Sequence, residues 1–558
     1  MKRVTLLLGV VCVMIAISAS GRPKNAKQPV PGESASAGGG SAQAGISGVV
    51  TGDKGKPVRG AVITAALGNR TVSGFSDEAG RYKISGLKVG DYTITATAYG
   101  LERKRDAKSL SRDVDLDFAL AERWDPGQLT TADWLTFLPQ NDDIHELTAT
   151  CTTCHNFSNF VRNRGISAAE FQAKVTTMGE GVCCGNYFRA AALARVPVLE
   201  KYFGADAPLP LPEQVHHAEI SQGALHSTIR EYTPPTASYI HSITVDPVKQ
   251  QVWFAEMNAT ANSIGQLDIA TEKITEYKLP TPDSQPHTLV VAPDGRVWVT
   301  LTMKQMVVML DPATGKITQI PGVSGHTPDV DYEGNIWLSG GETGASKYDP
   351  RTGKAEKFIL PVPAGLNPSP LSGEDKVSAA PKLTSCSTYD VAVDEKDNAW
   401  FTTNTCGYIA KIEGKTGKVT AFKVPNVGAM KGIAASPEGI WYSAYGAHQL
   451  GHLNPETGEV KLYSAPSPYS SPYGVYVDRY SGDVWYADFF GSRITRFDPK
   501  TEKFTEFTLP TNAEQARFMG EDAQGRIWYA DWHGKVGMLD PGDQPASLQI
   551  TVRKPATR

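Results

Sequence analysis

The segment Cys151-Thr152-Thr153-Cys154-His155 has the clearest chemistry in this sequence. Two thiols three positions apart on one helical turn can each add to a vinyl group of haem, and the adjacent histidine can then bind the iron. A thioredoxin-like pair and half of a zinc site are the alternatives. Neither requires the histidine, and the chain has no second Cys-x-x-Cys. The spacing therefore predicts covalent haem c held by Cys151, Cys154 and His155.

Met178 is the expected sixth ligand of that iron. It ends an amphipathic stretch, residues 168–178, and a thioether ligand there would raise the reduction potential. Packing of Met178 against the haem edge is the alternative role, and His145 is an outside candidate for the ligand. A second helical stretch, residues 190–203, is interrupted by Pro197. Residues 124–206 are thus predicted to form a small α-helical, cytochrome c-like domain.

Four cysteines remain outside the haem motif and the N-terminal Cys12. In an exported protein such thiols are usually oxidised. Cys386 begins one expected strand and Cys406 follows the next antiparallel one, so we expect a disulfide between them. For Cys183 and Cys184 a vicinal disulfide and two free thiols both remain open.

A second group of chemically active residues lies in a repeat that fills the last three-fifths of the chain. The repeat has an apolar alternating run, a tight turn, a tryptophan, an Asp-Pro turn and an outer strand. Its tryptophans are about 39 to 45 residues apart, with one step of about 63. This period is typical of a β-propeller with one four-stranded blade per repeat. The seven copies predict a seven-bladed propeller at residues 225–558, built around Trp253, Trp298, Trp337, Trp400, Trp441, Trp485 and Trp528.

One position of the repeat, about eleven residues before each tryptophan, is never aliphatic. It begins the innermost strand, and innermost strands line the central channel, so these side chains should meet at one mouth. They are the candidate catalytic residues His241, His287, His326, Tyr389, Lys431, Tyr473 and Arg517.

A second position, three residues after each tryptophan, should lie at the same mouth. It carries carboxylates in blades one, six and seven: Glu256, Asp488 and Asp531. Together with His241 and His287 they are the candidate ligands of a divalent metal, or part of an acid–base site. The alternative is a solvated channel mouth without chemistry.

The remaining chain predicts export and one further domain. Lys2 and Arg3, an apolar run and small residues make residues 1–21 a signal peptide, which predicts a periplasmic or secreted protein. Residues 22–43 are a Gly/Ser/Ala/Pro-rich flexible linker. Residues 44–121 alternate as short strands around Gly-containing turns. A net charge of −4 gives no indication of nucleic-acid binding.

Two stretches resemble known families. Gly60-Ala61, Gly80-Arg81-Tyr82 and Gly90-Asp91-Tyr92 resemble the carboxypeptidase regulatory-like domain. That resemblance implies an immunoglobulin-like β-sandwich. We interpret it as a spacer or adhesion module, and weak binding of cell-surface carbohydrate is the less favoured alternative. The fold class predicted for the whole chain is therefore mainly β: propeller, N-terminal sandwich and small helical haem domain.

The propeller resembles the virginiamycin B lyase (streptogramin lyase) family through residues 253–256, 262–265, 274–277 and 279–282, and through Pro286-His287 and Pro472-Tyr473. The resemblance implies a seven-bladed propeller that binds magnesium and opens a cyclic depsipeptide by elimination. By position, His241 or His287 would be the base, and Glu256 a carboxylate linked to the metal. Leu301 stands where that family's second blade has a glutamate, which is a departure from the pattern.

Two functions follow as hypotheses. The favoured one is an exported oxidoreductase or electron-transfer protein, with a small-molecule substrate at the channel mouth and a redox partner protein. The alternative is a lyase or a ligand-binding propeller with an accessory haem. We also expect the strand near residues 227–233 to close the last blade, in competition with residues 547–552. The loop at residues 364–385 should act as a partial lid over the mouth, and the haem should dock at that mouth.

Haem attachment gives the first test. A haem-stained denaturing gel of protein made with the c-type maturation machinery should show a band. The double variant Cys151→Ala and Cys154→Ala should abolish that band, because both thioether bonds are lost. Met178→Ala should shift the reduced spectrum toward high spin. An unchanged spectrum would assign the sixth ligand to another residue.

Overall fold

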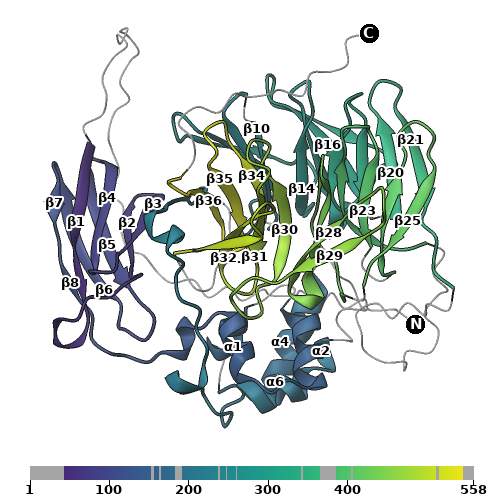
Figure 1. Ribbon diagram of the computed structural model, residues 1–558. Coiled ribbons are helices and arrows are strands. Elements are labelled where there is room, and N and C mark those ends of the chain that lie inside the picture. Colours follow the sequence, from purple (N-terminus) through teal and green to yellow (C-terminus); the bar gives the residue numbers. More distant parts are fainter. Residues whose placement is uncertain are drawn as a thin grey trace, which may run out of the picture. The chain divides into compact units, whose positions relative to one another are not determined.

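The computed structural model describes residues 43–152, 156–162, 165–181, 192–236, 239–246, 248–258, 260–340, 344–364, 385–403, 406–425, 427–510 and 515–543 (Figure 1). The chain divides into two units, Met1–Ser41 and Ala42–Arg558. The predicted signal peptide and all but the last residue of the predicted linker lie outside the described residues. So do residues 547–552 and residues 365–384 of the proposed lid. All elements below belong to the second unit.

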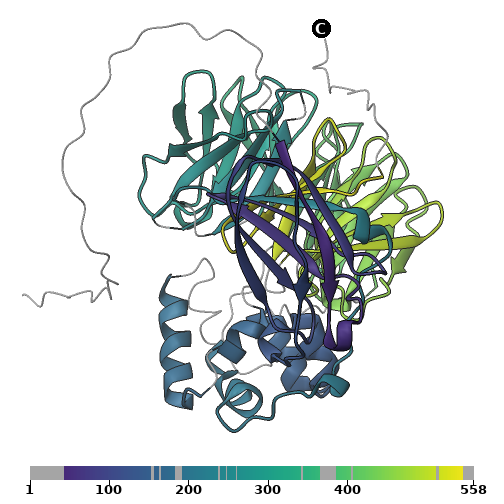
Figure 2. The same cartoon turned by 90° about the vertical axis from the view of Figure 1, so that its left-hand side faces the viewer.

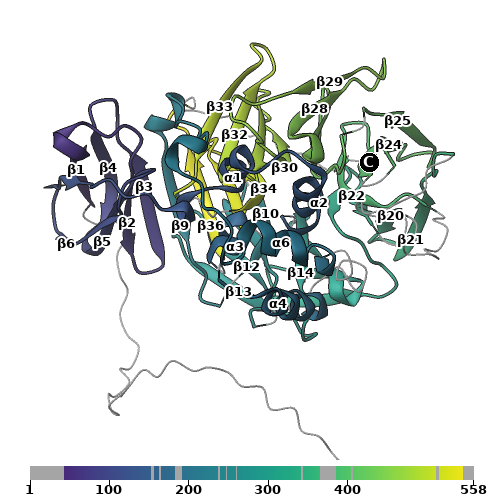
Figure 3. The same cartoon turned by 90° about the horizontal axis from the view of Figure 1, so that it is seen from below.

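The propeller has seven blades, which confirms the repeat analysis: six are separate four-stranded antiparallel sheets, and the seventh is part of a larger sheet. In the view from below, the labelled first strands lie toward the middle and several last strands toward the rim (Figure 3). The first four blades comprise β10 (Ile240–Asp246), β11 (Gln251–Glu256), β12 (Ser263–Asp268) and β13 (Ile274–Lys278); β14 (Pro286–Val291), β15 (Val297–Leu301), β16 (Met306–Asp311) and β17 (Lys316–Ile320); β18 (Pro328–Val330), β19 (Ile336–Ser339), β20 (Gly344–Asp349) and β21 (Lys354–Ile359); and β22 (Thr388–Val393), β23 (Ala399–Thr403), β24 (Tyr408–Ile412) and β25 (Val419–Lys423).

The later blades repeat this order. They comprise β26 (Ile433–Ser436), β27 (Gly439–Ala444), β28 (Gln449–Leu453) and β29 (Val460–Tyr463); β30 (Pro472–Val477), β31 (Val484–Asp488), β32 (Arg493–Asp498) and β33 (Lys503–Thr508); and β34 (Ala516–Glu521), β35 (Ile527–Asp531) and β36 (Lys535–Asp540).

The tryptophans that define the repeat are core residues, each at most 3 % exposed. Several also bond to the aspartate that begins the preceding turn. The indole N–H groups of Trp337, Trp400 and Trp528 donate to aspartate carboxylates at 3.0, 2.9 and 2.8 Å. A buried indole N–H needs an acceptor. The paired Asp and Trp therefore fix the hairpin between the first two strands of these blades.

The seventh blade is closed by an N-terminal strand, as predicted. β9 (Thr228–Tyr232) pairs antiparallel with β36, with Met538 opposite Arg230. Pairing the strand that precedes blade one with the last strand of blade seven leaves the ring of blades without an open seam. The other edge of β9 pairs with β3 of the N-terminal domain, which the sequence did not indicate. Blade seven therefore continues into an eight-stranded sheet.

The N-terminal domain has two sheets (Figure 2). One contains β1 (Gln43–Thr51), β4 (Arg81–Lys88), β7 (Val114–Asp115) and β8 (Phe118–Ala119), and the other β2 (Val62–Leu67), β3 (Arg70–Phe75), β5 (Gly90–Thr97) and β6 (Lys104–Leu110). Their facing apolar side chains form a separate core that includes Ile46, Ile63, Tyr82 and Ile94. This is the sandwich expected for residues 44–121.

Five α-helices are described between the sandwich and the propeller: α1 (Thr131–Phe137), α2 (Asp142–Cys151), α3 (Phe157–Arg162), α4 (Ala168–Gly181) and α6 (Val196–Phe203). Thr130 and Asp133 form a capping box at the start of α1, and the Asn141 side chain caps α2. α4 confirms the first predicted helix. Pro197 lies in the first turn of α6, where its missing N–H costs no hydrogen bond, so it begins that helix and does not interrupt it.

Short 3₁₀ turns connect these elements: η1 (Asp53–Gly55), η2 (Pro126–Gln128), η3 (Pro212–Gln214), η4 (Gly223–His226), η5 (Thr302–Lys304) and η6 (Tyr445–Ala447). Among the described residues, no helix has both the length and the apolar character needed to cross a membrane.

The role of β9 can be tested through Ile229, whose side chain is fully buried in that strand. Ile229→Ala should lower the free energy of unfolding by about 2–5 kcal/mol, because it removes packed methyl groups from the closing strand. As a control, Ile359→Ala, at a side chain 65 % exposed, should change stability by less than about 0.5 kcal/mol. Equal small losses in urea denaturation would show that β9 is not an integral part of the blade.

Candidate functional site

The seven residues predicted to meet at the channel lie where the inner strands begin. Five belong to β10, β14, β22, β30 and β34, and two, His326 and Lys431, stand two residues before β18 and β26. In the five strands the pairing register shifts directly after the start of the strand, for example between Ile240 and Ile243. Such bulges re-aim a side chain. The bulges turn these five residues out of the regular strand alternation, and the sequence pattern did not indicate them.

Six of these side chains form a closed chain of contacts around the channel. The ring centroids of His241 and His287 are 3.6 Å apart, those of His287 and His326 4.2 Å, and those of His326 and Tyr389 4.5 Å. The hydroxyl groups of Tyr389 and Tyr473 are hydrogen-bonded to each other. We call these five residues, together with Arg517 and Lys431, the channel ring.

Arg517 closes the channel ring. Its Nη1 donates to Tyr473 Oη at 2.8 Å and lies 3.2 Å from His241 Nε2. The Lys431 ammonium lies 4.0 Å from the centroid of the Tyr389 ring. Two permanent cations therefore sit among three imidazoles and two phenols, and all but His326 are less than 9 % exposed.

Two histidine tautomers follow from the hydrogen bonds. His241 Nδ1 lies 3.1 Å from the carbonyl oxygen of His287, and His326 Nδ1 lies 2.7 Å from that of Tyr389. A carbonyl oxygen only accepts, so Nδ1 carries the hydrogen in both rings. Each Nε2 then holds a lone pair when the ring is neutral.

Burial keeps these imidazoles neutral. It lowers the pKa of His241 and His287 well below the usual range, and the nearby positive charge of Arg517 lowers both further. Burial also lowers the pKa of His326 to about 4. Desolvation and a neighbouring cation both penalise the charged imidazolium. At neutral pH the three histidines are therefore uncharged, and a ring nitrogen that carries no hydrogen can accept a hydrogen bond.

The carboxylates of the second position do not reach these histidines. Asp488 accepts hydrogen bonds from the backbone of Ser471 and Gly491, and Asp531 accepts one from Gln515. Ser471 and Gln515 lie two residues before Tyr473 and Arg517, so these aspartates hold the start of two inner strands. Asp488 also lies 3.6 Å from the buried Arg493 guanidinium.

Glu256 is fully buried at the end of β11, on the side of the blade that carries Glu276. Burial raises the pKa of Glu256 to about 8, and the charge of Glu276 adds to this increase. A carboxyl group in such surroundings is neutral at pH 7.

A divalent metal does not fit this arrangement. The described part of the chain contains no group of three His, Cys, Asp or Glu side chains arranged to hold an ion. Of the two nitrogens of His241, one bonds to a carbonyl and the other faces Arg517. Metal ligation requires a free lone pair and is opposed by adjacent cations. The Mg²⁺ site expected from Glu256, Asp488, Asp531, His241 and His287 has no support in this geometry.

Of the predicted haem ligands, Cys151 lies in the described chain. It is the last residue of α2 and is 8 % exposed in an apolar core. Cys154, His155 and the side chain of Met178 lie outside the described residues, as do Cys183 and Cys184. The apolar surroundings of Cys151 suit the hydrophobic face of a porphyrin.

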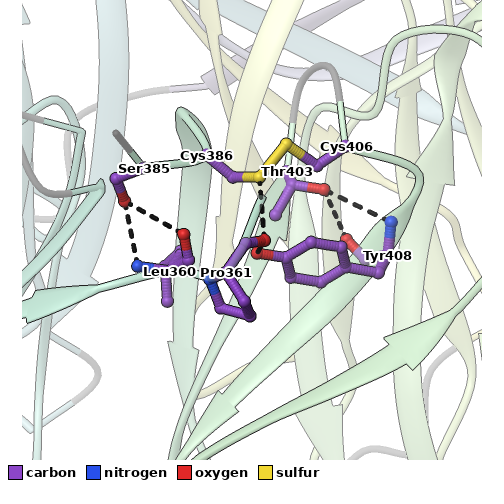
Figure 4. Close-up of a disulfide and its surroundings, with 7 residues drawn as sticks. All are labelled: Leu360, Pro361, Ser385, Cys386, Thr403, Cys406 and Tyr408. Carbon is purple, nitrogen blue, oxygen red and sulfur yellow. Dashed lines mark hydrogen bonds between the residues drawn. A yellow bond between two sulfur atoms is a disulfide. The ribbon is translucent and has the colours of Figure 1, made fainter. Parts of the chain in front are cut away.

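The predicted disulfide between Cys386 and Cys406 is confirmed (Figure 4). Its Cα atoms are 6.1 Å apart, which is normal for a bridged pair. Two hydrogen bonds lie beside the bridge. The Leu360 N–H donates to Ser385 Oγ at 2.9 Å, and the Tyr408 hydroxyl donates to the Pro361 carbonyl. The bridge therefore fixes the point where the long connection from blade three reaches blade four.

A layer of aromatic residues around the channel ring was missed from the sequence. Phe489 stacks on Tyr473 with centroids 5.0 Å apart, and Tyr445 meets Tyr473 edge to face. Trp532 lies 4.1 Å from the Arg517 guanidinium carbon. The motif Trp-Tyr-Ala-Asp followed by a further aromatic residue, at 485–489 and 528–532, is the signal that could have found Phe489 and Trp532.

This layer connects the channel ring to the helices. The Ala132 N–H, in α1, donates to the Phe490 carbonyl at 3.1 Å. One continuous apolar cluster contains Trp134 and Cys151 of the helical segment together with Phe489, Tyr473 and Tyr389 of the propeller. The helices thus pack at the mouth where the channel ring lies.

The state of Glu256 gives a pH-dependent prediction. Its pKa is about 8 when folded and about 4.3 when unfolded. Ionisation therefore favours the unfolded chain as pH rises between these values, and stability falls over that range. Glu256→Gln cannot ionise and should melt at a higher temperature than the wild type at pH 8, but at a similar temperature near pH 4.5.

Exposed Glu395→Gln is the matched control for Glu256→Gln and should follow the wild type at both pH values. Parallel melting curves of wild type and Glu256→Gln across the whole range would show that Glu256 ionises freely in the folded protein.

A model of the virginiamycin B lyase family matches residues 213–309 and 371–555, together just over half of the chain. A model of the carboxypeptidase regulatory-like domain matches residues 45–121. No curated protein sequence matches the chain.

Several solved structures are similar to the propeller. Virginiamycin B lyase from Staphylococcus aureus is 21 % identical, with 56 % of this chain and 99 % of that one covered and a TM-score of 0.48. A streptogramin B lyase structure is 22 % identical, with 57 % and 99 % covered and a TM-score of 0.49. Hydrazine synthase from Kuenenia stuttgartiensis is 12 % identical, with 54 % and 94 % covered and a TM-score of 0.42.

Proposed function

The chain belongs to the virginiamycin B lyase family through its propeller, and from that premise we propose that it is an exported c-type haem protein that oxidises a small-molecule substrate. In this proposal the channel ring is the substrate site, and the helical segment carries the haem. The sequence at residues 1–21 supports export, and the Cys-x-x-Cys-His motif supports haem.

The observation that carries the proposal is the shared apolar cluster of helices and channel ring. Cys151, the first cysteine of the haem motif, belongs to the same cluster as Tyr389 and Tyr473. The contact runs from Tyr473 through the stacked Phe489 to Phe490, whose carbonyl is bonded to α1. A haem attached there would lie on the channel-ring side of the propeller and would not be separated from it by the length of the channel.

The channel ring has the groups that such a substrate needs. The Nε2 atom of His326, which is uncharged at neutral pH, can accept a hydrogen bond from a substrate hydroxyl group and receive its proton when the substrate is oxidised. Arg517 and Lys431 can stabilise a negatively charged oxygen of the substrate. The buried aromatic layer excludes water, which strengthens both effects.

The haem would be held by thioether bonds to Cys151 and Cys154 and by His155, with Met178 as the second axial ligand. When bound, it supplies a one-electron acceptor. A substrate that loses one proton to the protein and one electron to this acceptor leaves as a radical, and a redox partner protein reoxidises the iron. Ascorbate, which gives up one electron and one proton, is a suitable probe.

Tyr473 provides the test, because it joins Tyr389, Arg517 and Phe489. Tyr473→Phe should slow haem reduction by ascorbate about tenfold in stopped-flow absorbance, the loss expected when a charge-assisted hydrogen bond at the substrate is removed. Reduction by dithionite, which attacks exposed haem directly, should be unchanged.

The matched control is Tyr463→Phe, at a partly exposed tyrosine in the outer strand of blade five. The haem of this variant should be reduced at the wild-type rate by both ascorbate and dithionite. If Tyr473→Phe and the alanine variants of His241 and His287 all match the wild type with ascorbate, the channel ring takes no part in electron transfer.

A further inference from the structure

A cavity of about 450 Å³ opens beside the channel ring at blades two and three. Its polar lining consists of Thr302, Gln305, Ser324, His326, Ser346 and Lys357. This volume is in the range of small-molecule sites. His326 thus faces both the channel ring and a space that a ligand can occupy.

Glycine at position 340 makes room for this cavity. It stands three residues after Trp337, where blades one, six and seven carry a carboxylate. Its φ is +77°, and a Cβ there would lie 3.0 Å from His326 Cβ. Any side chain would therefore be strained and would push against His326. Blade three is open at the point where those blades place a carboxylate.

His326 presents an unused acceptor. Its Nδ1 hydrogen is taken by the Tyr389 carbonyl at 2.7 Å, so Nε2 holds the lone pair. That Nε2 has no hydrogen-bond partner among the described residues. His241 differs, because its Nε2 already faces Arg517 Nη1. Of these two histidines, His326 is the one that can accept a hydrogen bond from a ligand.

The rest of the lining defines the ligand chemistry. Thr302 Oγ1 is buried without a hydrogen-bond partner within the described chain. Ser324, Ser346 and Gln305 add further donors and acceptors, and no aspartate or glutamate is among the described residues that line the cavity. The Lys357 ammonium is the one charged group in this lining and has no ion-pair partner in the part of the chain that the structure describes. Hydroxyl and amide groups around a single cation suit a ligand with several hydroxyl groups and one carboxylate.

We propose that this cavity binds a small sugar acid, whose carboxylate pairs with Lys357 Nζ and whose hydroxyl group donates to His326 Nε2. The inference rests on the proposed role of the channel ring as a substrate site and names the substrate class. It assigns first contact with the substrate to His326 in blade three, and not to His241 or His287.

Isothermal titration of the full-length protein with galacturonate tests the inference. Galacturonate should bind the wild type, and galactose, which has the same ring without the carboxylate, should bind at least about tenfold more weakly. Lys357→Ala should weaken galacturonate binding about tenfold, and should leave any galactose binding unchanged. Lys354→Ala is the matched control, because it changes a second exposed lysine of β21 that does not line the cavity. It should bind as the wild type does.

His326→Leu should abolish binding, with circular dichroism used to confirm that the variant is folded. Lys357 is exposed, so Lys357→Ala should fold normally, and it still tests the proposal if His326→Leu misfolds. Absence of galacturonate binding up to about 10 mM, or equal affinities in Lys357→Ala and Lys354→Ala, would overturn the proposal.

Titration does not depend on electron transfer, so the two failures are separable. If the wild type does not bind galacturonate but Tyr473→Phe slows haem reduction by ascorbate, the sugar-acid site alone is refuted. A protein that binds galacturonate but shows no effect in Tyr473→Phe would refute the proposed oxidation and keep the site.

Discussion

The buried guanidinium of Arg517 is the interaction on which the channel ring depends. Arg517 belongs to blade seven, bonds to Tyr473 in blade six and faces His241 in blade one, so it connects blade seven to both of its neighbours. Without a cation at this place the ring of contacts would be broken between Tyr473 and His241, and the buried Nε2 of His241 would lose the donor that it faces. The same charge adds to the effect of burial in lowering the pKa of His241 and His287, so both rings are uncharged at neutral pH.

Arg517 can occupy this place because blade seven is complete. Its strand β34 is held by β35, which pairs with β36, which in turn pairs with the N-terminal β9. Because β9 also pairs with β3, the sandwich is an extension of the same sheet. Glu272, from the turn between β12 and β13, ties this junction together through Arg70, Lys88 and the Tyr232 hydroxyl. The sandwich is therefore fixed to blades seven and one by strand pairing and charge together.

Repetition explains how much could be predicted from the sequence. Seven copies of one pattern reveal the blades, the closing strand and the side chains that face the channel, since each copy repeats the same strand order. The disulfide was predictable because Cys386 and Cys406 stand at ends of neighbouring strands. Departures from strand regularity were not predictable, because the bulges after Ile240 and Pro286 follow from packing around the channel.

The second position of the repeat, three residues after each tryptophan, shows what an alignment of the repeats does not reveal. It placed Glu256, Asp488 and Asp531 at the correct ends of their strands, but alternation along a strand does not say what each carboxylate bonds to. Asp488 and Asp531 bind backbone N–H groups of the adjoining loops, and Glu256 faces Glu276. Pro197 shows a similar limit, because a proline can begin a helix as well as break one.

The central claim is that channel ring and haem lie at the same mouth of the propeller, and the haem midpoint potential tests it most directly. Removal of a buried positive charge near the iron stabilises its oxidised form. Arg517→Gln should therefore lower the potential in a spectroelectrochemical titration, by an amount on the order of tens of millivolts. Arg526→Gln, at the turn after β34 at the opposite end of blade seven, should leave the potential unchanged. Equal potentials in the wild type and both variants would contradict the account.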